Sequence, residues 1–88
     1  MNKKWVTIVD DGEAVFCLGV FDTKEEAIGR AHLKIAKFAC EYTNEGDTFS
    51  TGTLRADGFG GYYILIEFKD AEWEKSHQEL YRILPVDD

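Results

Sequence analysis

The sequence predicts a single α+β domain in which a small antiparallel sheet packs on one long amphipathic helix. Two hairpin patterns flank one stretch with four turns of helical periodicity. The chain has 88 residues, which fits one domain spanning residues 1–88 with one core. Its content of 44% apolar and 14% aromatic residues is typical of a folded globule. We therefore expect the order ββαββ, followed by a short helix and a fifth strand.

The first hairpin is predicted from two runs rich in Val, Ile and Phe, at residues 5–9 and 14–21. They are joined through Asp11 and Gly12, a pair that tolerates the positive φ angles of a tight hairpin turn. Both faces of the second run are apolar. We therefore expect the second strand to lie at the centre of the sheet.

The long helix is predicted to begin at Asp22 or Thr23, because each has a glutamate three residues later and can form a capping box. The expected core-facing positions follow the helical repeat and are Ile28, Ala31, Ile35, Phe38, Ala39 and Tyr42. Gly46 suits the left-handed conformation that follows a helix end. A second flank of small residues could accept either the short helix or a second chain, and consists of Gly29, Leu33, Ala36 and Cys40.

A second hairpin is predicted from strands at residues 48–55 and 62–68. The earlier strand is polar enough for a sheet edge. In the later strand one face is expected to meet the helix, and it carries Tyr62, Ile64, Ile66 and Phe68. Asp70 can then cap a short helix over residues 71–79. Residues 80–86 either extend that helix to Pro85 or form a fifth strand, and we favour the strand.

The chain is acidic, with a net charge of −7 from 17 Asp and Glu against 10 Lys and Arg. This charge disfavours direct binding to nucleic acid. It would speed association with a basic surface, such as the groove by which another protein holds DNA or RNA. Much of the acidity lies near the C-terminus, in Glu72, Glu74, Glu79, Asp87 and Asp88. Whether this acidity is functional or only keeps the protein soluble stays open.

Few residues suggest catalysis or a cofactor. The nitrogen and sulfur ligands are His32, His77, Cys17 and Cys40, without CxxC or HxxxH spacing, so we expect no metal site. Both thiols are expected to be buried and reduced. No nucleophile motif or phosphate-binding motif is present, so we expect neither an enzyme nor a bound cofactor. The lack of an apolar leader or membrane-length apolar run predicts a cytoplasmic protein without membrane contact.

The loop formed by Gly58, Phe59, Gly60 and Gly61 has two interpretations. It is a flexible hairpin loop, or a partner-contact loop with Phe59 as an apolar anchor. The chain also holds more aromatic surface than so small a core can hide, in Trp5, Trp73, Tyr62, Tyr63 and Tyr81. We expect some of these rings to be exposed or buried between chains.

Together these features suggest a non-catalytic protein-binding module that inhibits or regulates a basic, nucleic-acid-handling protein. The candidate partner-binding residues are Phe59, Glu72, Trp73, Glu74, Glu79, Asp87 and Asp88. Small acidic inhibitors occur among phage counter-defence, antitoxin and immunity proteins, which is an analogy of size and charge. The alternative is a domain that sequesters a small molecule or nucleotide. Its pocket would lie between subunits of a homo-oligomer and use Tyr62, Tyr63 and the glycine-rich loop.

Overall fold

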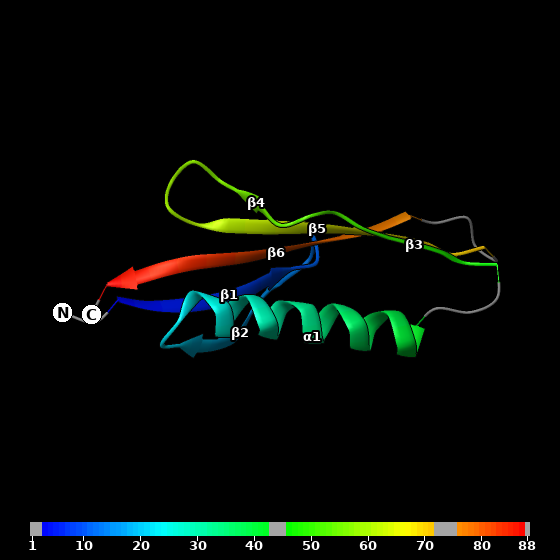
Figure 1. Ribbon diagram of the computed structural model, residues 1–88. Helices are drawn as coiled ribbons and strands as arrows, with labels where there is room; N and C mark the ends of the chain where they lie inside the picture. The colour runs from blue at the N-terminus through cyan, green and yellow to red at the C-terminus, as the bar shows by residue number, and fades with distance from the viewer. Residues whose placement is uncertain (1–2, 43–45, 72–75, 88) are drawn as a thin grey trace.

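The computed structural model describes residues 3–42, 46–71 and 76–87, which form one helix and one antiparallel sheet of six strands. The strand order is β2-β1-β6-β5-β3, with β4 beside β5 (Figure 1). The elements are β1 (Lys3–Asp10), β2 (Val15–Phe21), α1 (Lys24–Tyr42), β3 (Thr48–Thr51), β4 (Arg55–Ala56), β5 (Tyr62–Lys69) and β6 (Ser76–Asp87). The predicted α+β class is confirmed, whereas the element order differs after the helix.

The core lies between α1 and one face of the sheet. Its buried members come from the helix and from three strands, and are Val9, Ala27, Ala31, Ile35, Ile64, Ile66, Tyr81 and Ile83. Each larger side chain of this set contributes roughly 1.5–3 kcal/mol by leaving water. No described element covers the opposite face of the sheet, which we call the open face. The described part of the protein thus has two layers, the helix α1 and the six-stranded sheet.

The first hairpin forms as predicted, but β2 is an edge strand rather than a central one. Its side chains are largely exposed, with 64% of Val15, 52% of Phe16 and 60% of Val20 accessible. Strand β2 therefore has apolar residues on both of its faces although many of their side chains stay in water. The turn is held by Asp11, whose Oδ1 accepts hydrogen bonds from the N–H groups of Ala14 at 2.8 Å and Glu13 at 2.9 Å.

The long helix also forms as predicted, and Thr23 is its cap. Thr23 Oγ1 accepts a hydrogen bond from the Glu26 N–H at 3.1 Å, and its hydroxyl lies 3.0 Å from the Glu26 carboxylate. The buried Thr7 hydroxyl donates to the Ala27 carbonyl oxygen at 2.7 Å, which fixes the helix to β1. The small-residue flank around Leu33 is exposed, and no described element packs on it. Among the described residues, no helix is both long and apolar enough to cross a membrane.

The second hairpin pairs β3 and β4 with β5, but the strand predicted over residues 48–55 is interrupted. At the break, the Gly52 N–H donates to the Leu65 carbonyl oxygen at 2.7 Å. A Cβ atom on Gly52 would lie 3.0 Å from that oxygen, so a larger residue at this break would crowd the backbone of β5. The predicted edge position of this strand and the helix-facing side of β5 are confirmed, with Ile64 and Ile66 fully buried.

The largest correction concerns the C-terminal part of the chain. The short helix predicted over residues 71–79 is wrong from Ser76 onward, since Ser76 begins β6; residues 72–75 lie outside the described part. The fifth strand predicted over residues 80–86 is confirmed and is longer than expected. β6 pairs with both β1 and β5, so its backbone groups find partners on both sides. Pro85 lies opposite Trp5, beyond the point where β5 stops pairing, and its missing N–H breaks no ladder there.

Candidate functional site

The most exposed large apolar side chain of the described residues is Phe59, which is 91% accessible. It lies in the loop between β4 and β5, which we call the Phe59 loop (residues 57–61). Asp57 Oδ1 accepts hydrogen bonds from the N–H groups of Phe59 at 2.7 Å and Gly61 at 3.0 Å. The Asp57 N–H donates to the Gly61 carbonyl oxygen at 3.0 Å. Between them Gly58 and Gly60 adopt φ angles of 84° and 91°. The loop is therefore a hydrogen-bonded turn that holds Phe59 in solvent.

The base of the Phe59 loop is packed against β6 through Gly61. A Cβ atom there would lie 2.6 Å from Asp57 Oδ2, 2.9 Å from the Ile83 carbonyl oxygen and 3.0 Å from Leu84 Cδ2. Only glycine allows this approach without a shift of the backbone. The position of Phe59 is thus set by a central strand of the sheet.

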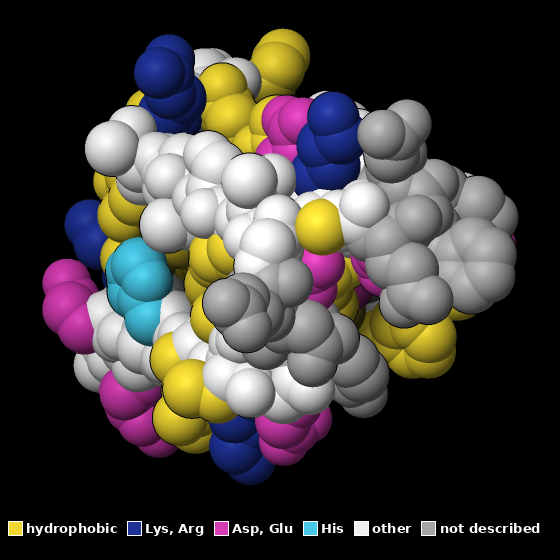
Figure 2. Space-filling model, turned by 90° about the vertical axis from the view of Figure 1, so that its right-hand side faces the viewer, with side chains coloured by type: hydrophobic (Ala, Val, Ile, Leu, Met, Phe, Trp, Pro, Cys, Tyr) yellow, Lys and Arg dark blue, Asp and Glu magenta, His cyan; other side chains and the backbone are white. Residues whose placement is uncertain are grey.

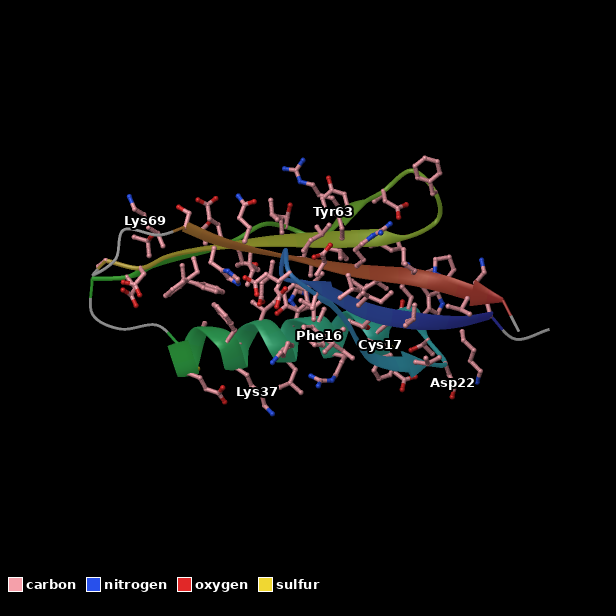
Figure 3. All side chains as sticks on the ribbon, turned by 180° about the vertical axis from the view of Figure 1, so that it is seen from behind. Phe16, Cys17, Asp22, Lys37, Tyr63 and Lys69 are labelled. Carbon is pink, nitrogen blue, oxygen red and sulfur yellow. The ribbon has the colours of Figure 1, made fainter. Side chains whose placement is uncertain are left out.

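Beside the loop, the open face carries a hollow of about 340 Å³. It is lined by Ser50, Gly52, Arg55, Tyr63, Leu65 and Glu67. Tyr63 lies on the side of β5 away from α1 (Figure 3). Across the strands, Arg55 is opposite Tyr63, and Tyr63 is opposite Arg82 on β6. The hollow and the loop together offer apolar, aromatic and guanidinium groups for binding, which are the groups that protein interfaces favour.

A second hollow of about 440 Å³ lies where the β1–β2 hairpin meets α1 and β6. It is lined by Val9, Asp11, Phe16, Cys17, Leu18, Lys34 and Glu79. The backbone hydrogen bonds from Ala14 and Glu13 lower the pKa of Asp11 below its ordinary value, so this carboxylate is charged at neutral pH. The hollow therefore combines an apolar floor with charges of both signs.

Glu79, one of the predicted partner-binding residues, is bound within the protein. Its side chain is 12% exposed, and Oε1 accepts a hydrogen bond from the Tyr81 hydroxyl at 2.8 Å. Oε2 lies 3.6 Å from His77 Nε2. Burial, and then the hydrogen bond to Glu79, raise the pKa of Tyr81 far above its ordinary value. This carboxylate is engaged by its neighbours rather than displayed to a partner.

The other predicted acidic residues do not form a described surface. Glu72, Trp73, Glu74 and Asp88 lie outside the described residues. Asp87 ends β6 opposite Lys3. On the end of the molecule shown in Figure 2, acidic and basic side chains are interspersed among hydrophobic ones. An acidic face remains a prediction.

The remaining candidates are spread over the molecule. Cys17 and Cys40 are exposed free thiols, so the prediction that they are buried is wrong. Among the residues that the structure describes, no three His, Cys, Asp or Glu side chains gather as metal ligands do.

Tyr62 lies on the helix side of β5, with its ring centre 6.4 Å from that of Trp5, whereas Tyr63 lies on the open face. One chain cannot direct both tyrosines into the same pocket, because adjacent residues of a strand face opposite ways.

Sequence reasoning identified Phe59 and its glycines, but it missed Asp57, Arg55 and Arg82. An Asp-Gly pair is a known turn signal, so Asp57 could have been found from the sequence. The two arginines could not, because their alignment depends on the register of three strands.

The sequence matches no protein-family model and no curated protein, and no solved structure matches the fold.

Proposed function

We propose that this protein is a non-catalytic protein-binding module that inhibits or regulates its target, with the Phe59 loop as the anchor of its interface. The supporting observation is a phenylalanine that is 91% exposed on a turn held by hydrogen bonds. Aromatic side chains are enriched in protein interfaces relative to the rest of the surface. A fixed turn also loses little conformational entropy on binding.

The net charge of −7 supports a basic, nucleic-acid-handling protein as the target. The carboxylates that would meet such a target include Glu72 and Glu74, which lie outside the described residues. The choice of target is therefore a separate part of the proposal and has a separate test, namely the dependence of binding on salt.

The test is capture of proteins from a lysate of the native host, with wild type and Phe59→Ala as immobilised baits at low and high salt. We expect one protein to be retained by wild type and lost with Phe59→Ala. Burying a phenylalanine is worth roughly 1.5–3 kcal/mol, so affinity for the purified target should fall roughly 10- to 100-fold. Thermal unfolding of Phe59→Ala should match wild type, because the ring lies outside the core.

The matched control is Leu33→Ala, which removes another exposed apolar side chain, 52% accessible, from the solvent side of α1. Its captured proteins should equal those of wild type. Equal capture by Phe59→Ala and wild type would reject the loop as the anchor. Capture that does not weaken at high salt would reject electrostatic recognition of the target while leaving the anchor in place.

A second candidate function is the binding of a small molecule, favoured by the hollow of about 440 Å³ between the first hairpin, α1 and β6. A metabolite that binds there should raise the melting temperature of wild type. The increase should disappear in Lys34→Ala, since Lys34 lines the hollow. A metabolite library that leaves the melting temperature unchanged would argue against this function.

A further inference from the structure

The open face has a charge opposite to that of the molecule as a whole. Strand alternation and register place Arg55, Lys69 and Arg82 on it, together with Asp10 and Glu67. Tyr63 and Lys69 both lie on the side away from α1 (Figure 3). Three cations against two carboxylates give this set a net charge of +1, within a chain of net charge −7. Lys4 also belongs to this side of β1, but it is paired with Asp22.

The centre of the open face is a row of three side chains on three adjacent strands. Arg55 on β4, Tyr63 on β5 and Arg82 on β6 are direct cross-strand neighbours. Neighbours of this kind have Cβ atoms about 5 Å apart, so both arginine side chains leave the sheet next to that of Tyr63. Both arginines are exposed, and neither has an ion-pair partner among the described residues. We call these residues the Arg-Tyr-Arg row.

Apolar side chains surround the row on the same face. They include Val6, Ile8, Leu65, Leu80, Leu84 and Val86, of which Leu65 is 42% and Val86 41% exposed. The Phe59 loop joins β4 to β5 immediately after Arg55 and Ala56, so its anchor follows Arg55 closely along the chain. Arginine and tyrosine within an apolar surround are the composition of interface hot spots.

We propose that the open face binds an acidic, apolar segment of a partner protein, with carboxylates on Arg55 and Arg82 and an apolar side chain beside Tyr63. Guanidinium groups bind carboxylates in two-pronged hydrogen bonds, and a low-dielectric surround strengthens them. A second copy of this chain is a poor occupant, because face-to-face packing would set one positively charged row against another. The inference rests on the proposed protein-binding function and specifies an acidic segment of the partner that meets the open face, distinct from the basic surface that the carboxylates of this chain would meet.

The experiment uses ¹⁵N-labelled protein and two short synthetic peptides, one alternating Glu with Leu and the other alternating Lys with Leu. We expect the Glu-Leu peptide to shift the amide signals of Arg55, Tyr63, Leu65 and Arg82, and the Lys-Leu peptide to leave them unchanged. The double variant Arg55→Glu with Arg82→Glu should lose this response. Lys37→Glu, a charge reversal on the exposed side of α1, should keep it (Figure 3).

Three results would overturn the inference. The Glu-Leu peptide could produce no shifts on the open face, or the double variant could respond as wild type does. An oligothymidylate could bind the same residues more tightly than the peptide, which would assign the row to phosphates instead of carboxylates. None of these measurements needs the target captured from the lysate. Failure here, with a Phe59-dependent target in hand, would leave the proposed function standing.

Discussion

At the scale of single residues, Tyr81 is the buried group with the most distinctive chemistry. Its side chain is fully buried, and its hydroxyl donates to Glu79. Burial, and then the hydrogen bond and negative charge of Glu79, disfavour ionisation of this hydroxyl and raise the pKa of Tyr81. The hydroxyl therefore stabilises the fold only while it keeps its proton.

Replacing Tyr81 with Phe should lower the free energy of unfolding by about 1–3 kcal/mol at neutral pH, because Glu79 loses its donor. The stabilisation by Tyr81 is fully present below the unfolded-state pKa of 10.0 and is lost as pH rises above it. The difference between wild type and variant should thus shrink in alkaline solution. Urea unfolding at neutral and alkaline pH measures this difference in the free energy of unfolding, with Tyr63→Phe on the open face as the control. A difference that stays constant across this pH range would contradict the stabilising role of the protonated Tyr81 hydroxyl.

At the scale of elements, the Phe59 loop is held against β6 by the close approach of Gly61. Replacing Gly61 with Ala would push a methyl group into the Ile83 carbonyl oxygen and Leu84. We expect a loss of about 1–3 kcal/mol in the free energy of unfolding. Chemical denaturation measures this loss.

The control is Gly29→Ala, on the exposed side of α1, where an added Cβ atom meets nothing within 4 Å. This change should stabilise the protein by about 0.5–1 kcal/mol, because alanine favours the helix. A Gly61→Ala variant at least as stable as wild type would show that Gly61 has no special packing role.

The elements also show what the sequence could predict. α1 and β5 follow their periodicities over enough residues to identify both elements and their buried faces. β6 was harder, because Trp73, His77 and Leu80 have helical spacing while the partners that make a strand there come from distant β1 and β5. The pairing of β6 with β1 and β5 therefore outweighed the helical spacing of the local sequence. The edge position of β2 was missed because an apolar sequence does not reveal which side chains stay in water.

The same limit applies to the candidate site. Phe59 was predictable, since an apolar residue between glycines stands out in any sequence. The Arg-Tyr-Arg row requires β6 to be a strand and to pair with β5 in one register. A one-residue slip would move Arg82 to the helix side. The site therefore could not be predicted until the topology was known.

At the scale of the whole molecule, β6 holds the two halves of the sheet together. Its twelve residues run about 40 Å, most of the 50 Å length of the molecule. The β1–β2 hairpin lies on one side, and β5 with β3 and β4 on the other. Tyr81 and Ile83 of β6 are also fully buried core residues.

A chain ended at residue 75 should therefore lose its cooperative thermal transition. It would lack the central strand and the burial of Tyr81 and Ile83, each worth roughly 1.5–3 kcal/mol, out of a total stability of about 5–15 kcal/mol. Circular dichroism during heating measures the transition, and a synthetic peptide of residues 76–88 added in trans should restore it. A truncated chain that melts as wild type does would exclude this role for β6.

The position of β6 also determines when the protein can fold. Strand β6 pairs with β1, with Lys3 opposite Asp87, and the two strands lie side by side in Figure 1. Contacts between such distant residues are slow to form, because the intervening chain must first be brought together. On the ribosome, the hairpin and helix can emerge and collapse early, yet the sheet stays in two separate pieces until β6 leaves the exit tunnel. During that interval β1 and β5 each have an unpaired edge that could join another chain, so chaperone protection is most needed until β6 has emerged.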